Sequence, residues 1–275
     1  MTGFALEVTL HWIAVGLYVV ATGLLANAVI FGHSRRMRWG VLAAALGVFP
    51  HGAALVIRWI AVGHGPYLVR YEVLSSNAWI AVVALVLFLR RRPAWSALAL
   101  VVLPAAILAV ALGVFSSTEV RRIPPTLRSM WLVFHVSFAK LAAAAFLLSL
   151  AAAILQLVRA RGASFSWLDR VPATDVLDAY TVRFVGFGFL FWTVAIAGGA
   201  IWANQSWGRY WGWDPIETWS LIAWLTYGSF LHARLFFRMR PLPTAWASVA
   251  AFAVFVLTLL VLPLLLPSIH SAYFQ

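Results

Sequence analysis

The feature of this chain that most constrains its fold is a succession of long apolar segments separated by short polar ones. A helix of about 20 apolar residues crosses the hydrocarbon core of a bilayer, and every one of these segments is close to that length or longer. The eight segments cover roughly residues 5–31, 39–61, 73–89, 94–115, 129–158, 181–203, 218–237 and 244–266. They leave no room for a separate soluble domain, so we expect one all-α, polytopic membrane domain over residues 1–275.

The composition and the charge support this interpretation. Hydrophobic residues make up 64% of the chain and charged residues 10%, which does not suit a surface in contact with water. The net charge of +12 would suggest nucleic acid in a soluble protein, but the basic residues cluster in loops between apolar segments. We therefore expect the lipid bilayer as a partner and no nucleic acid.

The arginines are divided unevenly between alternate loops. One set of loops holds twelve: Arg35, Arg36, Arg38, Arg90, Arg91, Arg92, Arg159, Arg161, Arg170, Arg234, Arg238 and Arg240. The opposite set holds five: Arg70, Arg121, Arg122, Arg128 and Arg209. Because positive charge is retained on the cytoplasmic side, the first set is predicted to be cytoplasmic and both termini external.

The sequence contains no Cys, so this chain has no disulfide, thiolate metal site or redox dithiol of its own. Any thiol chemistry must come from a partner. The first apolar segment has Glu7 ahead of it and is too long for a signal-peptide core, so we expect it to be a retained span.

The densest unusual feature is a stretch at residues 202–219, predicted to be an external loop between the sixth and seventh helices, with five Trp in eighteen residues. One interpretation is an aromatic belt at the membrane interface. The crowding of the rings and the presence of Gly208 and Gly212 favour a planar platform for a flat ligand with a wide π-face, with Arg209 placed to pair with a carboxylate. A porphyrin with its propionates has these properties. The candidate binding residues are Trp202, Trp207, Arg209, Tyr210, Trp211, Trp213, Asp214, Glu217 and Trp219.

Asp214 and Glu217 have two interpretations. They are spaced like a pair of catalytic carboxylates, but Asp-Pro-x-Glu before an apolar segment is also a helix start. We favour the second, in which Asp214 is the N-cap, Pro215 the first helical residue and Glu217 the third residue of a capping box.

Histidines inside a membrane are costly and suggest function. His135, near the external end of the fifth helix, and His270, in the external tail, are placed to be the two axial ligands of a haem iron. His232 lies roughly 20 Å from Glu217 along the seventh helix, so it belongs either to a second, inner site or to a hydrogen bond between helices. We expect His51 to form an interhelical hydrogen bond and His11, His33 and His64 to contact solvent.

The string WGRYWGWDPIETW at residues 207–219 resembles the tryptophan-rich haem-handling signature of the cytochrome c assembly family, of the CcsA or ResC type. Further matches are Arg58-Trp59, the segment from Gly63 to Pro66, Tyr71-Glu72, His135, the segment from Leu231 to Arg234, and His270-Ser271. The resemblance implies an eight-span protein of the bacterial inner membrane, or of the thylakoid, that receives haem b from the cytoplasmic side. It would present this haem externally to the CxxCH thiols of apocytochrome c.

The resemblance also implies roles and partners. His135 and His270 match the external axial ligands of the family, and His232 matches an intramembrane histidine whose counterpart ligand is carried by a ResB (CcsB) partner. A thioredoxin-like thiol reductant is a further expected partner. Our first hypothesis is the haem-presenting subunit of a holocytochrome c synthase. The alternatives are a haem-binding regulator or chaperone of the HemX or CcmC type, and an unrelated transporter with the Trp stretch as a lid.

Overall fold

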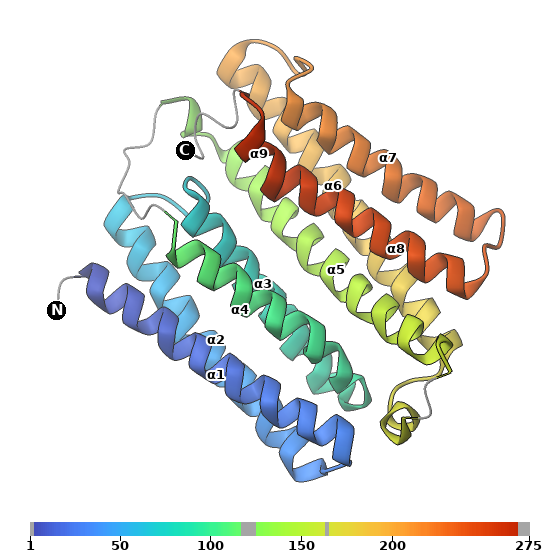
Figure 1. The fold of residues 1–275 in the computed structure, drawn as a ribbon. Helices are drawn as coiled ribbons and strands as arrows, with labels where there is room; N and C mark the ends of the chain where they lie inside the picture. The colour runs from blue at the N-terminus through green and yellow to red at the C-terminus, as the bar shows by residue number, and fades with distance from the viewer. Residues whose placement is uncertain (1–2, 117–124, 163–164, 269–275) are drawn as a thin grey trace. The chain divides into compact units, whose positions relative to one another are not determined.

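The computed structural model describes residues 3–116, 125–162 and 165–268. Over these ranges the protein consists of helices joined by short loops (Figure 1). The elements are α1 (Gly3–Phe31), α2 (Ser34–Val62), α3 (Arg70–Arg91), η1 (Pro93–Leu98), α4 (Ala99–Val114), η2 (Pro125–Leu127), α5 (Met130–Ala160), η3 (Ser166–Arg170), α6 (Thr174–Trp207), α7 (Pro215–Leu235), α8 (Pro241–Val256), η4 (Leu257–Val261) and α9 (Leu262–Leu265).

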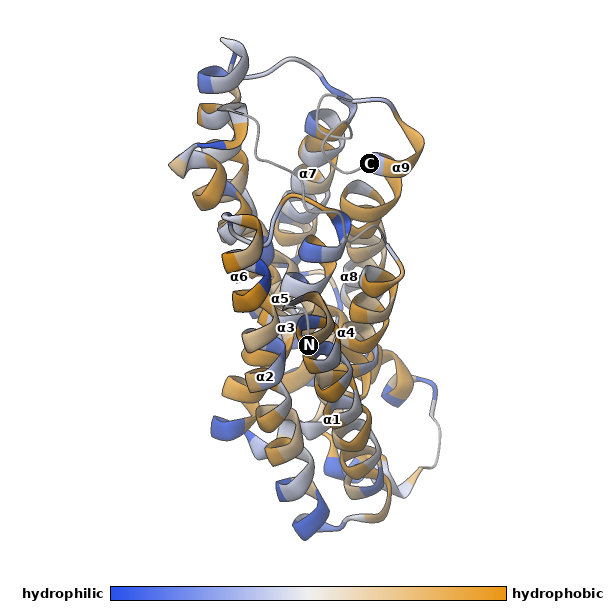
Figure 2. Cartoon of the chain, turned by 90° about the vertical axis from the view of Figure 1, so that its left-hand side faces the viewer, coloured by the Kyte–Doolittle hydropathy of each residue, from blue (hydrophilic) through white to orange (hydrophobic). Residues whose placement is uncertain are grey.

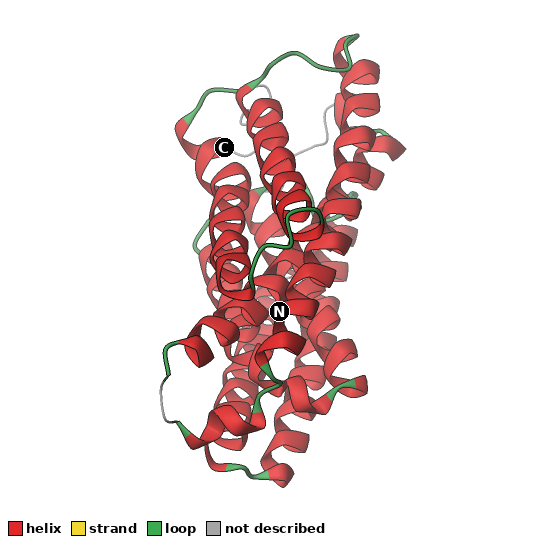
Figure 3. Cartoon of the chain, turned by 90° about the vertical axis from the view of Figure 1, so that its right-hand side faces the viewer, coloured by secondary structure: helices red, strands yellow, loops and turns green. Residues whose placement is uncertain are grey.

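The predicted all-α membrane bundle is confirmed. The helices are apolar along most of their length, and hydrophilic residues gather at their ends and in the loops (Figure 2). In the described ranges seven helical segments are long and apolar enough to cross a membrane: Phe4–Phe31, Ser34–Val62, Arg70–Arg91, Pro93–Val114, Met130–Ala160, Thr174–Trp207 and Pro241–Leu265. The remaining long helix, α7, has 21 residues, is not among these seven, and carries Glu217, His232 and Arg234. No strand occurs in the part of the chain that the structure describes (Figure 3).

The contacts divide the chain into two compact units, and the expectation of a single domain over 1–275 stays a prediction. The first unit comprises Met1–Val120 and Ile154–Leu177, and the second comprises Arg121–Ala153 and Asp178–Gln275. The first therefore contains α1 to α4, and the second contains most of α5 and α6 together with α7 to α9.

In the first unit α1 packs along α2 and against α4, while α3 packs against α2 and α4. The turn from α2 to α3 has clear local causes. Gly63, with φ of 76°, ends α2 in the left-handed conformation that glycine adopts without a Cβ penalty. Glu72 then accepts the backbone N–H groups of Leu68 at 3.0 Å and Val69 at 3.4 Å, which satisfies donors left open at the start of α3.

Two histidines of the first unit do not match the sequence expectation. His33 is exposed, as expected, but His11 and His64 are buried, with 1% and 4% of their surface exposed. His11 lies two turns inside α1, not at its end, because the helix begins at Gly3. His64 lies in the turn after α2, where its Nδ1 donates to the carbonyl of Gly65 at 2.7 Å.

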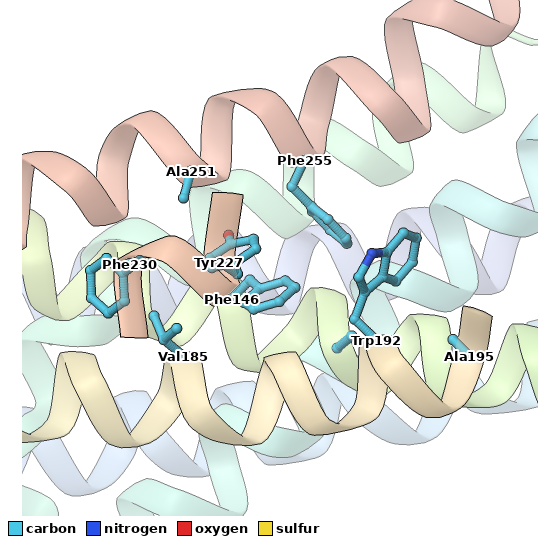
Figure 4. Close-up of a cluster of buried hydrophobic side chains, with 9 residues drawn as sticks. Phe146, Val185, Trp192, Ala195, Tyr227, Phe230, Ala251 and Phe255 are labelled. Atoms are coloured by element: carbon cyan, nitrogen blue, oxygen red, sulfur yellow. The ribbon is translucent and has the colours of Figure 1, made fainter. Parts of the chain in front are cut away.

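The core of the second unit is an aromatic cluster (Figure 4). Phe146 of α5 and Tyr227 of α7 are stacked with ring centroids 3.6 Å apart, and Phe255 of α8 meets Phe146 edge to face at 5.0 Å. Gly188 of α6 makes room for this stack, since a Cβ there would lie 2.4 Å from the Phe146 ring. The cluster therefore holds four helices of the unit together.

The last membrane segment changes its helical form near its end. After α8, residues Leu257–Val261 form a π-helical turn, and α9 follows with Pro263 in its first turn. Proline lacks the N–H that the helix needs and crowds the preceding turn, so the wider turn accommodates it without ending the segment.

Candidate functional site

The candidate site centres on His135, which lies in the second turn of α5. Its Nδ1 is 2.7 Å from the carbonyl oxygen of Ala195 on α6. A carbonyl only accepts, so Nδ1 carries the proton and donates, and the lone pair of the neutral imidazole is on Nε2. Histidines that bind metal are commonly oriented in this way, with the second ring nitrogen bonded to a backbone carbonyl.

Two neighbouring glycines of α6 allow this contact. A Cβ on Gly199 would lie 2.7 Å from His135 Nδ1, and a Cβ on Gly198 would lie 3.0 Å from Phe134. Glycine at these positions lets α6 come this close to α5 without displacing the rings of Phe134 and His135. Neither the two glycines nor the Ala195 carbonyl was predicted from the sequence, although an adjacent glycine pair within an apolar segment is a visible signal of close helix packing.

Two tryptophans at the end of α6 extend the site. Trp202 is buried, its ring is nearly parallel to that of His135 at a centroid distance of 6.4 Å, and its Nε1 donates to the carbonyl of Thr126 at 2.9 Å. Trp207 meets Trp202 edge to face at 4.9 Å. Aromatic surface therefore continues from the imidazole to the last residue of α6.

The tryptophan-rich stretch is not a loop throughout. Residues 202–207 form the last turns of α6, and residues 215–219 form the first turn of α7, so the loop itself covers residues 208–214. Gly208, with φ of 72°, terminates α6, and its N–H bonds to the carbonyl of Asn204 at 2.9 Å. Trp219 is half-buried on α7, and its carbonyl accepts from the Thr258 hydroxyl at 3.3 Å.

The capping box at the start of α7 is confirmed. Asp214 accepts the N–H of Ile216 at 3.0 Å, and Glu217 accepts the N–H of Asp214 at 3.2 Å. Glu217 also accepts the N–H of Gly212 at 2.7 Å, so one carboxylate holds two points of the loop. Both acids are thus engaged in holding the backbone, which supports the capping interpretation of the pair.

The loop presents polar and aromatic groups outwards. Tyr210 is 60% exposed and Trp213 is 70% exposed, and Trp213 has a positive φ of 57°. That backbone conformation is unfavourable for a bulky residue and is common at ligand-binding sites. The guanidinium of Arg209 lies over Gly212, where a Cβ would be 2.1 Å from Arg209 Cζ, and no acidic side chain pairs with Arg209 among the described residues.

The expectation of one flat aromatic platform is wrong for these rings. Trp211 and Trp213 meet at 86°, and Trp202 and Trp207 meet at 64°. Edge-to-face contact is the favoured geometry for such pairs, because the positive ring edge meets the negative face. The rings therefore offer a mixture of edges and faces.

His232 occupies a different position from His135. It lies near the end of α7 opposite the loop, about 25 Å along the helix from Pro215. Its side chain is exposed, its ring stacks on Phe236 at 4.6 Å, and it meets Phe237 edge to face at 5.3 Å. Both phenylalanines are more than 70% exposed, so an exposed imidazole stands in an exposed aromatic patch. His270, the second predicted axial ligand, lies outside the described residues.

The arrangement defines a class of protein: a polytopic helical membrane protein in which an oriented imidazole lies beside a capped, tryptophan-rich loop. The family model for the cytochrome c assembly protein matches residues 67–270, and this chain belongs to that family. The family resemblance inferred from residues 207–219 is confirmed, and the role of the protein lies in cytochrome c assembly.

Similar proteins cover most of the chain. The cytochrome c biogenesis protein CcsA of Prochlorococcus marinus (strain MIT 9303) is 34% identical over 265 residues, which are 84% of this chain and 82% of that protein. CcsA of Chlorella vulgaris is 35% identical over 217 residues, 66% of this chain and 69% of its own. A solved structure of cytochrome c haem lyase CcmF shares the fold, with a TM-score of 0.70 over 94% of this chain at 18% identity. The chain spans about half of that longer structure, 46%.

Proposed function

We propose that this protein binds haem b at the external face of the membrane and presents it to the CxxCH thiols of apocytochrome c. The observation that carries the proposal is the hydrogen bond from His135 Nδ1 to the Ala195 carbonyl at 2.7 Å, beside the ring of Trp202. This bond fixes the tautomer that an axial haem ligand requires. Haem is therefore the substrate that this site fits.

His135 and His270 are the proposed axial ligands of the haem iron. The exposed guanidinium of Arg209 suits a propionate, because Arg forms charge-assisted and often bidentate bonds to carboxylates. The proposed aromatic contacts come from Trp202, Trp207, Tyr210, Trp211, Trp213 and Trp219. Asp214 and Glu217 act on haem indirectly, by holding the loop.

The attachment reaction adds a cysteine S–H bond across a haem vinyl group, so that sulfur bonds one carbon and the hydrogen the other. The residues of this chain bind and orient haem and exclude water, and none needs to act as a nucleophile. Positioning of the reacting groups is the proposed catalytic contribution, in a complex that acts as a holocytochrome c synthase.

A second haem position is proposed at His232. The exposed imidazole and the exposed Phe236 and Phe237 form a surface to which a partner can bring a second ligand. A membrane protein of the ResB (CcsB) type is the proposed partner there, and a thioredoxin-like reductant would keep the apocytochrome thiols reduced. The protein lacks cysteine of its own.

The proposed orientation places the tryptophan-rich loop outside. Twelve arginines lie in the loops and helix ends of the opposite side against five on the loop side, and we take the positive side to face the cytoplasm. The proposed location is the bacterial inner membrane, or the thylakoid membrane for a plastid protein.

The test is an absorption spectrum of the purified protein with and without a co-expressed ResB-type partner. The wild type should show a low-spin spectrum with two imidazole ligands. His135→Ala should lose it and recover it in part with added imidazole, whereas His33→Ala, which removes an exposed histidine from the turn before α2, should keep it. An unchanged low-spin spectrum in both His135→Ala and His270→Ala would show that the ligands are assigned wrongly.

Deletion of the gene distinguishes the proposed function from the alternative hypothesis of a haem-binding regulator. Loss of mature c-type cytochromes supports attachment, while intact cytochromes with altered levels of haem precursors would support the regulator. Absence of any haem absorption with the partner present would favour the unrelated transporter.

A further inference from the structure

A chain of buried polar side chains runs through the first unit, and none of them belongs to the proposed haem site. Its members are Glu7, His11 and Tyr18 of α1, His51 of α2, and Tyr71 and Ser75 of α3. Each side chain is at most 2% exposed, inside helices that are long and apolar enough to cross a membrane. Ionisable groups in such positions are costly and usually have a role.

Hydrogen bonds connect these groups without a break. The Tyr18 hydroxyl lies 3.1 Å from His51 Nδ1, and His51 Nε2 lies 3.0 Å from the hydroxyl of Ser75. The same hydroxyl lies 2.7 Å from His11 Nε2. His11 Nδ1 lies 3.2 Å from the hydroxyl of Tyr71, which donates to a carboxylate oxygen of Glu7 at 2.6 Å.

With both imidazoles neutral, one contact fixes the directions of the bonds that the two histidines make. His11 Nδ1 lies 3.0 Å from the backbone carbonyl of Glu7, which only accepts, so Nδ1 carries the proton. His11 Nε2 is then an acceptor, and the single proton of Ser75 points to it. His51 must therefore donate from Nε2 to Ser75, which leaves His51 Nδ1 to accept from Tyr18.

The two imidazoles are thus opposite tautomers on either side of one hydroxyl. Each of the four groups between Tyr18 and Glu7 accepts from one neighbour and donates to the next, and all the donors point from Tyr18 towards Glu7. This is the arrangement in which a proton can pass by successive short transfers. Among the described residues, the Ser75 hydroxyl is the single hydrogen-bonded link between the two histidines.

The chain reaches from the first turns of α1 to the middle of that helix. Glu7 lies in the first turns of α1, and Tyr18 lies eleven residues further on, about 16 Å along the helix. That distance is about half of the ~30 Å hydrocarbon core. His51 is eleven residues from the end of α2, at a similar depth.

Charged groups surround the Glu7 end. The Arg58 guanidinium lies 5.5 Å from the centre of the Tyr71 ring and is paired with Glu72 at 2.9 Å, and His64 lies 3.8 Å from the other oxygen of Glu72. Burial and the Glu72 charge raise the pKa of Tyr67, in the same turn, above its usual value. The Glu7 end therefore lies beside the polar turn between α2 and α3, with Arg58 over the ring of Tyr71.

We propose that these six residues form a proton relay between the membrane interior at His51 and the membrane face at Glu7. A proton that reaches His51 Nδ1 through Tyr18 releases the Nε2 proton to Ser75. Ser75 passes its own proton to His11 Nε2, the Nδ1 proton of His11 moves to Tyr71, and the Tyr71 proton joins Glu7. One proton enters and one carboxylic acid forms. The intervening groups keep their charge, but both imidazoles change tautomer and the hydroxyl protons point the other way, so the relay is then set to run in the opposite direction.

The relay is tested by hydrogen exchange of the imidazole N–H groups, which does not depend on haem. Full-length protein with ¹⁵N-labelled histidine is placed in lipid bilayers and transferred to D₂O, and the ring signals of His11 and His51 are followed by solid-state NMR. The wild type should show His11 protonated on Nδ1 and His51 on Nε2. Solvent deuterons enter from the Glu7 end, so exchange uses the relay in the reverse direction, and the ring N–H of His11 should exchange before that of His51.

The decisive variants are Ser75→Val and Ser75→Thr, which have the same shape and differ by the hydroxyl. The relay predicts that His51 exchanges about tenfold or more slowly in the Val variant than in the Thr variant. His11, on the solvent side of the break, should exchange at equal rates in both. In a purely structural cluster the ring N–H groups exchange only when the helices open. The proposal would be overturned if both rings slowed equally in Ser75→Val, if both exchanged there at the same rates as in Ser75→Thr, or if both exchanged faster.

Tyr71→Phe provides a second break if the variants at Ser75 do not fold. It keeps the ring beside Arg58 and removes the hydroxyl between His11 and Glu7. Both histidines should then exchange more slowly than in the wild type. Wild-type exchange of both rings in Tyr71→Phe would overturn the proposal as well.

Discussion

Replacement of Gly199 by alanine places a methyl group against the proposed haem ligand without touching the ligand itself. The added Cβ would lie 2.7 Å from His135 Nδ1 and 3.0 Å from its Cε1, where ordinary contacts begin at 3.4 Å. The imidazole must therefore recede by about 0.7 Å (3.4 minus 2.7). This movement lengthens the 2.7 Å distance from His135 Nδ1 to the Ala195 carbonyl oxygen beyond about 3.2 Å, the normal limit for such a hydrogen bond.

The structure lets the effects on stability and on haem binding be separated. Loss of the hydrogen bond and crowding destabilise the fold by about 1–3 kcal/mol, and alanine in a helix offsets up to about 1 kcal/mol of this. Misorientation of a metal-binding histidine typically lowers affinity by about 10–100-fold. We therefore expect a folded variant, slightly less stable than the wild type, with strongly reduced haem content.

The assay is the ratio of haem to protein absorbance after purification with the partner, together with a thermal unfolding curve. Gly186→Ala is the matched control, because it lies on the same helix and its Cβ would meet no atom within 4 Å. It should keep its haem and unfold at an equal or higher temperature. If Gly199→Ala kept the haem content and the low-spin spectrum of the wild type, the geometric account of His135 would be refuted.

Three other variants test separate parts of the structure. Asp214→Ala removes the cap of α7 and should lower the free energy of unfolding by about 1 kcal/mol, seen as a lower Tm, while an unchanged Tm would contradict the cap. Gly188→Ala sets a Cβ 2.4 Å from the Phe146 ring and should cost about 1–3 kcal/mol in the same assay, so wild-type stability would show that the α5–α6 contact is looser than described. His232→Ala removes an exposed ring and should leave Tm nearly unchanged while it lowers the haem recovered with a ResB-type partner; undiminished haem would argue against an inner site.

Helix positions were predictable from the sequence because the bilayer imposes a length and a composition on every crossing segment. The predicted first segment, residues 5–31, compares with Gly3–Phe31, and the predicted third, residues 73–89, compares with Arg70–Arg91. The largest error lies at the sixth segment, predicted at residues 181–203 but extending over Thr174–Trp207. Polar side chains at both of its ends, and the indole of Trp207 at the second, lower the hydropathy there, so the helical turns at the ends are not predicted from hydropathy.

The capping box was predictable because it depends on four consecutive residues. The spacing of Asp214, Pro215 and Glu217 specifies the contacts locally, and the structure contains them. The orientation of His135 was not predictable, because it depends on a carbonyl 60 positions away at Ala195 and on the missing side chain of Gly199. Hydropathy records neither of these.

The buried histidines of the first unit show why position along a helix is a poor guide to solvation in a membrane protein. His11 lies near the start of an apolar segment, which suggests contact with water, yet Ser75 and Tyr71 of α3 enclose it. On a hydropathy scale, serine and tyrosine lower the value of an apolar segment only slightly. Together, however, they supply the hydrogen bonds that make a buried imidazole tolerable. The same partners determine its tautomer and its connection to His51. Burial and connectivity at this cluster therefore arise from the same interhelical contacts, and a substitution at Ser75 should change both while leaving the hydropathy of α3 nearly unaltered.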